Sequence, residues 1–290
     1  MPENIFRQLQ EQLDQYSVGF PAAESGVEMK ILKRLFTEEE AEMYLHMSMM
    51  LETPDSVAGR LKQNPAQVAL LLDGMAEKGL LFRTRKGDES KYGAAPFVVG
   101  IYEFQLKTMD VELARLFDDY FEEAFTEQGS RQVVPMRTIP VKKSIGVSWK
   151  VTPYEDARGI IKSMERLAVA DCICRVQQGL LDQSCDKPLE VCFLGGSHGA
   201  YYVDRGMGRW VEQEEALEIL DRCEEAGLVP QPFNAINPGG LCNCCGDCCG
   251  VLRSLKKHPR PVEAVVTNHY ALVDEDLCVG CEVCLDRRDR

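Results

Sequence analysis

Twelve of the thirteen cysteines in this chain gather in three groups between positions 172 and 284. Thiolates at this density bind metal, either as ligands of zinc or as the terminal ligands of an iron-sulfur cluster. Only Cys223 stands outside the groups. The groups are Cys172, Cys174, Cys185 and Cys192; Cys242, Cys244, Cys245, Cys248 and Cys249; and Cys278, Cys281 and Cys284.

The first group offers four thiols within 21 residues, the number that a cubane cluster or a tetrahedral zinc ion needs. Zinc ribbons prefer separated CxxC pairs, and this group contains none. The spacing therefore favours an iron-sulfur cluster, with zinc as the alternative. Arg175 directly follows Cys174, and a positive side chain beside cluster sulfurs stabilises the reduced state. We therefore expect Arg175 to contact the cofactor.

The second group places five cysteines in eight residues, from Cys242 to Cys249. Adjacent cysteines project in different directions, so we do not expect all five to bind one ion. One member of the pair Cys244 and Cys245 is expected to serve a neighbouring cluster or to stay free. The group predicts metal binding strongly without indicating which metal.

The third group, CVGCEVC, resembles the cluster-binding loop CxxCxxCxxxCP of bacterial ferredoxins. Cys278, Cys281 and Cys284 occupy its first three cysteine positions, and the preceding HYALVDEDL is similar to the strand and turn that enter this loop. The position of the fourth cysteine is Arg288, and the sequence ends two residues later. We therefore expect a truncated or altered ferredoxin motif.

Residues 166–290 as a whole are similar to the 4Fe-4S ferredoxin-type proteins of anaerobic bacteria and archaea. This resemblance implies two or three low-potential [4Fe-4S] clusters. It also implies one-electron transfer, usually beside a larger oxidoreductase that acts as the redox partner protein.

The cellular compartment decides the state of such thiols. The amino-terminal residues lack a basic stretch followed by an apolar run, and no segment has the roughly 20 apolar residues that span a bilayer. We therefore expect a cytoplasmic protein without membrane association. In reducing cytosol clustered thiols ligate metal, and an odd count of thirteen fits a disulfide framework poorly.

The formal net charge of -13 argues against nonspecific nucleic-acid binding, because polyanions are captured by basic surfaces. Proteins are therefore the expected partners.

Helix signals dominate the first 100 residues. The helices in this part of the chain must help to position the thiols. Residues 1–27 predict an amphipathic leader helix. Thr37, Thr53 and Asn64 stand where N-terminal helix caps are preferred, the last two before a proline. Residues 80–99 predict two extended runs joined by a turn.

Residues 28–98 resemble the winged helix of MarR-like and ArsR-like repressors. In that family the third helix enters the DNA major groove with basic and amide side chains. The helix expected after Pro65 carries only Asp73, Glu77 and Lys78 as charged residues, and the basic residues lie in the hairpin. The sequence therefore favours a structural or protein-docking role for this unit.

These patterns predict an α+β protein with a winged-helix-like amino-terminal domain and a cysteine-rich, ferredoxin-like iron-sulfur region. The expected segments are a helical leader (1–27), a winged-helix-like domain (28–100), a helical connector with short strands (101–165), a cysteine-rich domain (166–262) and a partial ferredoxin motif (263–290).

The expected function is single-electron relay through [4Fe-4S] clusters. No catalytic triad or dinucleotide-binding fingerprint is present, so we do not expect catalysis on an organic substrate. Cys223 lies in an amphipathic helical pattern and is interpreted as a packing residue. Two alternatives remain, a redox-sensing winged-helix transcription regulator and a structural zinc-binding module.

Overall fold

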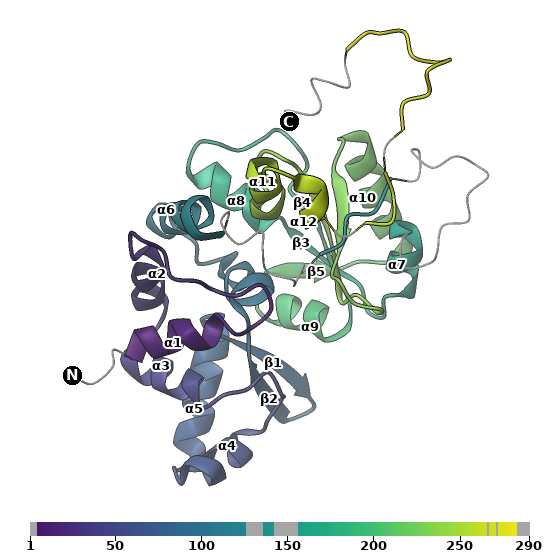
Figure 1. The fold of residues 1–290 in the computed structure, drawn as a ribbon. Coiled ribbons are helices and arrows are strands. Elements are labelled where there is room, and N and C mark those ends of the chain that lie inside the picture. The colour runs from purple at the N-terminus through teal and green to yellow at the C-terminus, as the bar shows by residue number, and fades with distance from the viewer. Residues whose placement is uncertain (1–4, 126–135, 142–155, 266, 271, 283–290) are drawn as a thin grey trace.

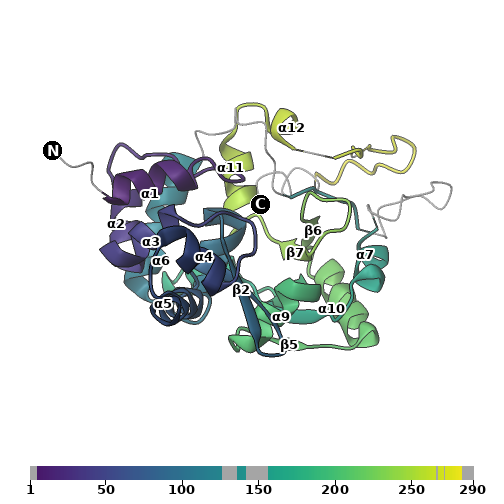
Figure 2. The same cartoon turned by 90° about the horizontal axis from the view of Figure 1, so that it is seen from below.

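A computed structural model describes residues 5–125, 136–141, 156–265, 267–270 and 272–282 of the chain (Figures 1 and 2). Helices and strands are both present, so the mixed α+β class expected from the sequence is confirmed. No helix in these ranges is long and apolar enough to cross a membrane.

The amino-terminal unit consists of short helices followed by a hairpin. In chain order its elements are α1 (Ile5–Leu13), α2 (Val27–Leu35), α3 (Glu38–Leu45), α4 (Pro54–Leu61), α5 (Pro65–Glu77), β1 (Leu81–Lys86) and β2 (Glu89–Ala94). Thr37 and Glu40 form a reciprocal capping box on α3, and Thr53 and Asn64 cap α4 and α5. These three helix starts were predicted correctly.

The next segment is less regular than its apolar pattern predicts. It contains η1 (Phe97–Ile101), η2 (Glu103–Gln105), α6 (Val111–Tyr120) and η3 (Phe121–Phe125). The helix restarts at Asp110, whose carboxylate accepts a hydrogen bond of 2.8 Å from the Leu113 amide. The helical character expected for this part of the connector is present, but it is divided into several short elements. Most of the expected connector with short strands, 130–151, lies outside the described residues; within 136–141, Met136 bridges to Phe233.

The carboxy-terminal unit is built on a five-stranded antiparallel sheet in the order β5-β3-β4-β7-β6. Its elements are α7 (Ala157–Ser163), β3 (Ala168–Asp171), α8 (Ile173–Leu180), β4 (Glu190–Leu194), α9 (Gly196–Asp204), β5 (Gly208–Trp210), α10 (Gln213–Glu225), β6 (Val229–Pro232), β7 (Gly240–Cys244), α11 (Gly250–Lys257) and α12 (Pro261–Ala264).

The two faces of this sheet belong to different cores, because successive side chains of a strand point to opposite faces. One face packs against α7 and α10, where Cys223 is buried as expected. The other face joins the core of the amino-terminal unit through α9. The first face carries Val169, Val191, Phe193 and Leu241, whereas Ala170 and Leu194 belong to the second.

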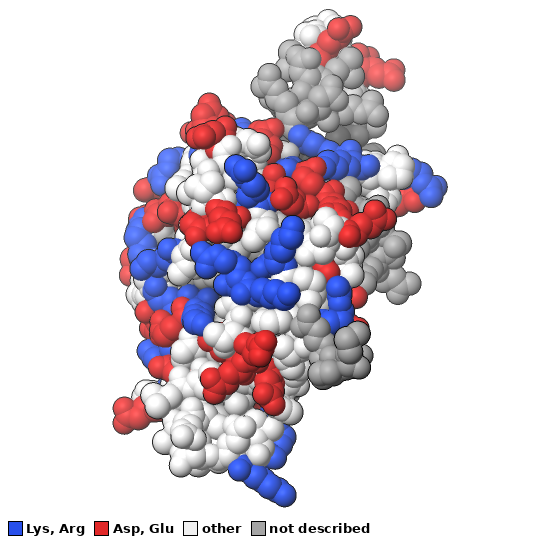
Figure 3. All heavy atoms as spheres, turned by 90° about the vertical axis from the view of Figure 1, so that its left-hand side faces the viewer, with Lys and Arg blue, Asp and Glu red and all other residues white. Residues whose placement is uncertain are grey.

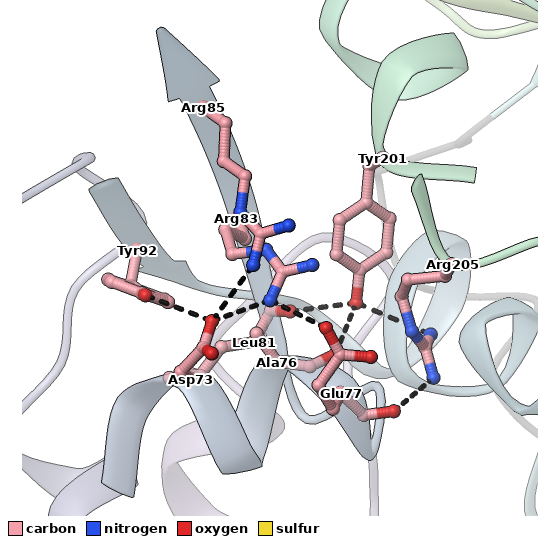
Figure 4. Close-up of polar contacts among 9 residues, drawn as sticks. All are labelled: Asp73, Ala76, Glu77, Leu81, Arg83, Arg85, Tyr92, Tyr201 and Arg205. Atoms are coloured by element: carbon pink, nitrogen blue, oxygen red, sulfur yellow. Dashed lines mark hydrogen bonds and ion pairs between the residues drawn. The ribbon is translucent and has the colours of Figure 1, made fainter. Parts of the chain in front are cut away.

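Polar contacts hold α9 against the amino-terminal unit (Figure 4). The Tyr201 hydroxyl lies 3.0 Å from the carbonyl oxygens of both Ala76 and Leu81, at the junction of α5 and β1. Arg205 donates to the carbonyl of Glu77 over 2.5 Å. The two units therefore share both an apolar core and a hydrogen-bonded contact.

The described residues after α12 extend away from the rest of the molecule (Figure 1). The Cys278 amide donates to the Asp274 carbonyl over 2.9 Å and closes a turn. Within 272–282 the chain forms no strand, so the strand expected before the ferredoxin-like loop is not formed there.

Candidate metal centre

Strand β7 divides the densest cysteine group between the two faces of the sheet. Cys242 and Cys244 line a cavity on the face toward the amino-terminal unit. Between them, Asn243 donates from Nδ2 to the Val191 carbonyl over 2.8 Å. Cys245 belongs to the core beneath α7 and α10. The alternation of an extended strand thus separates the adjacent cysteines, as the sequence led us to expect.

Six thiols form a closed ring, in which each side chain interacts with the next and the last with the first. We call this arrangement the six-thiol ring. Within it, no three sulfur atoms lie within 4.8 Å of one another. In order around the ring the members are Cys172, Cys174, Cys249, Cys244, Cys242 and Cys192.

Two helix N-termini meet at the ring. Cys172 immediately precedes α8, and Cys249 immediately precedes α11. The Gly250 amide donates to the Cys174 sulfur, and the Leu252 amide donates to the Cys249 sulfur. Free amides and the positive end of the helix dipole both favour negative charge at this place. The backbone is therefore arranged to stabilise thiolate or cluster charge.

The ring forms part of the wall of a cavity of about 270 Å³ between the two units. Much of the remaining wall is apolar and comes from the hairpin and the segment after it. Tyr102 and Glu103 also line the cavity, close to the ring. Burial raises the pKa of Glu103 to about 8, and its carboxylate accepts a 2.6 Å hydrogen bond from the Gly100 amide. Burial, and then the neighbouring Cys174, raise the pKa of Tyr102.

Sequence reasoning missed these two residues. Both belong to the stretch interpreted as helical packing, and nothing in its spacing distinguishes Tyr102 or Glu103 from the other aromatic and acidic residues there.

A second, tighter thiol group consists of Cys185, Cys245 and Cys248, here called the three-thiol group. Their sulfur atoms all lie within 4.8 Å of one another. The Cys185 and Cys245 sulfurs are 3.6 Å apart. Cys245 and Cys248 are buried, whereas Cys185 is half-buried.

Arg175 lies between the two thiol groups and is only 2% exposed. Its Nη2 donates to the Asn243 carbonyl over 3.1 Å, while Nε and Nη1 have no oxygen or nitrogen acceptor among the described residues. Burial would lower the pKa of Arg175, but the neighbouring Cys172, Cys245 and Cys185 raise it. A buried cation is costly unless anions face it, so this arrangement favours thiolates in both groups.

Each group contains one thiol that ionises readily. Hydrogen bonds from Cys192 and Cys244 lower the pKa of Cys242 to about 7. In the three-thiol group, the hydrogen bond from Cys248 lowers the pKa of Cys245 to about 4. Because thiolates are the metal-binding form, each group has a first ligand available near neutral pH.

The spatial groups differ from the sequence groups, which corrects the predicted ligand sets. Cys185 does not join Cys172, Cys174 and Cys192 in one four-thiol site, because the chain after α8 carries it to Cys245. Proximity in sequence misled here, since both sites draw their remaining thiols from β7 and the residues that follow it. The charge of Arg175 interacts with thiols of both groups, and its expected contact with a cofactor stays a prediction.

The ferredoxin-like group is not brought to the other thiols within the part of the chain that the structure describes. Cys278 and Cys281 are exposed. Cys284 lies outside the described residues.

Comparison of the chain with protein-family models, curated proteins and solved structures gives no match.

Proposed function

We propose that the six-thiol ring binds an iron-sulfur cluster of the [4Fe-4S] type and that the protein relays single electrons to or from a partner oxidoreductase. The observation that carries this proposal is the closed ring of thiols beside a buried guanidinium, two of whose nitrogens have no oxygen or nitrogen acceptor among the described residues. The cluster would supply reversible one-electron chemistry, and its potential would respond to nearby charge and hydrogen bonds.

The shape of the ring favours a polynuclear cluster over a single ion. A tetrahedral ion draws its ligands to one point, whereas each thiolate of a cubane binds a different iron atom. The ring has no three sulfurs within 4.8 Å of one another, so its sulfurs do not converge on one point. It offers the four thiolates that a cubane requires, with two more beside them.

The surroundings of the ring suit a redox centre. Arg175 and the amides of Gly250 and Leu252 would stabilise the more negative, reduced state and raise the potential. The apolar cavity wall limits contact with water, and this also tunes the potential.

The amino-terminal unit is proposed to have a winged-helix-like form and to dock the redox partner. Exposed apolar side chains on it, Met50 at 74% and Leu70 at 76%, support a protein contact. On the face shown in Figure 3, acidic and basic side chains are interspersed. Arg83 in the hairpin is paired with Asp73 at 2.6 Å and Glu77 at 2.7 Å (Figure 4). This pairing disfavours DNA binding, the alternative in which the protein is a redox-sensing regulator.

The test is to purify the full chain without oxygen, record its visible spectrum and measure iron and acid-labile sulfide. We expect a brown protein with at least about four iron and four sulfide per chain. The variants Cys192→Ser and Cys242→Ser should lose most of both, whereas Cys223→Ser, a buried thiol outside the ring, should keep them. A colourless protein, or one whose iron and sulfide contents are unchanged by both ring substitutions, rules the proposal out.

A further cluster at Cys278, Cys281 and Cys284 remains a prediction from the ferredoxin resemblance. It would appear in the same measurement as iron that survives the ring substitutions but is lost when these three residues are changed to serine.

A further inference from the structure

We propose that Cys185, Cys245 and Cys248 bind a single tetrahedral divalent metal ion of the zinc type, in a site separate from the six-thiol ring. The proposal does not depend on what the ring binds.

The spacing of the sulfurs fits one ion. Sulfurs bound to a tetrahedral zinc at about 2.3 Å lie about 3.8 Å apart. The Cys185 and Cys245 sulfurs are 3.6 Å apart, and all three lie within 4.8 Å of one another. Thiolates of a cubane bind different irons and stand farther apart, so the group is too compact for that cluster.

The local sequence and backbone also suit such an ion. Cys245 and Cys248 have the CxxC spacing of zinc knuckles. The Cys248 amide donates to the Cys245 sulfur, and the Cys185 amide donates to the Cys248 sulfur. These hydrogen bonds favour the charged thiolate form and hold two of the sulfurs in place.

The charges balance when one ion is bound. Three thiolates and a divalent ion carry a net charge of −1, and the buried guanidinium of Arg175 beside Cys185 and Cys245 carries +1. Without anionic neighbours that guanidinium would remain buried and uncompensated.

Soft thiolate ligands favour zinc over the hard cations, which prefer oxygen. Among the described residues no fourth Cys, His, Asp or Glu atom completes the group. The fourth position is therefore open to water or another external ligand, as in reactive zinc sites. The ion would link two segments of the chain, the loop that contains Cys185 and the turn after β7.

The test uses the full chain with Cys278, Cys281 and Cys284 replaced by serine, so that these terminal thiols bind no added metal. The iron-loaded protein is titrated with Co²⁺, which reports tetrahedral thiolate coordination through its visible absorption. Zinc, iron and sulfide are measured in parallel.

We expect about one Co²⁺ or zinc per chain. Cys185→Ser and Cys248→Ser should weaken its binding by at least about 100-fold, since even loss of an outer-shell partner costs 10–100-fold. Cys223→Ser is the matched control, because this thiol is buried in the same core but lies outside the group. Iron and sulfide should be unchanged in all three variants.

Co²⁺ binding that is unaffected by Cys185→Ser overturns the proposal, and so does loss of iron and sulfide in that variant. Cys185 is half-buried, so this variant remains informative even if Cys248→Ser does not fold. If the parent protein contains no iron but binds one Co²⁺, and Cys185→Ser does not bind it, the ring proposal fails and this one stands.

Discussion

Glu103 is an acid enclosed beside the six-thiol ring, and its ionisation opposes folding. Burial raises its pKa from an ordinary value of 4.5 to about 8. The folded state therefore binds this proton more tightly than the unfolded chain does. Its contribution to stability is complete below about pH 4.5 and is lost as the pH rises through about 8. A negatively charged cluster in the ring would push the pKa in the same direction.

Replacing Glu103 with Gln removes this titration while keeping an oxygen that can accept from the Gly100 amide. We expect the stability of Glu103→Gln relative to the parent to increase by about 1–3 kcal/mol as the pH is raised from 6 to 9. Thermal unfolding across this range measures the difference. Glu11→Gln, on an exposed residue, is the control. A stability difference that does not change with pH argues against the assignment.

At Arg175 the sequence and the structure agree on the residue and differ on its surroundings. The sequence indicated a cation beside the first cysteine group, because Arg175 follows Cys174 directly. It could not indicate that the guanidinium also faces Cys245, which is 70 positions away and arrives through pairing of β4 with β7. Long-range strand pairing leaves no signal in local spacing.

Helix α9 is the element that ties the metal-binding unit to the amino-terminal unit. Its Tyr201 is 1% exposed, and its hydroxyl contacts two backbone carbonyls. Tyr201→Phe leaves the Ala76 and Leu81 carbonyls without this donor while preserving the packing of the aromatic side chain.

We expect Tyr201→Phe to lower the free energy of unfolding by about 1–3 kcal/mol. Denaturant unfolding measures the effect, and Tyr270→Phe, at 86% exposure, should change it very little. An equal loss in both variants means that the two carbonyls do not depend on Tyr201.

Elements with local signals were predicted well from the sequence. The starts of α3, α4 and α5 carry Thr37, Thr53 and Asn64, whose side chains cap the helices directly. Strand β7 was not predicted, because Gly and Cys dominate GLCNC and hide its alternation. Without that strand, the sequence predicted that Cys244 and Cys245 point in different directions but not which face of a sheet each one reaches.

At the scale of the whole molecule, the six-thiol ring joins segments separated by up to 77 residues, from Cys172 to Cys249. Bound metal would therefore act as a cross-link between β4, β7 and the starts of α8 and α11. Its removal also takes away part of the negative charge that compensates the buried guanidinium of Arg175.

We expect anaerobic chelation to reduce stability by about 3–5 kcal/mol, the cost of leaving a buried charge unpaired. The melting temperatures of loaded and stripped protein measure this loss, which should be smaller in Arg175→Met. Melting of the variant with Cys278 and Cys281 changed to serine should match the parent, since both are exposed. Equal melting of the loaded and stripped parent contradicts a structural role for the metal.

The side-chain amide of Asn243 helps to fix the register of β7 against β4. Its Nδ2 reaches the Val191 carbonyl from the strand position between two ring thiols. A slip of β7 by one residue would turn Asn243 and Cys245 toward the cavity and send Cys242 and Cys244 to the opposite face. The chain would then present the wrong sulfurs to both metals at once. Both thiol groups therefore require the native pairing of β4 with β7, to which this one side-chain amide contributes.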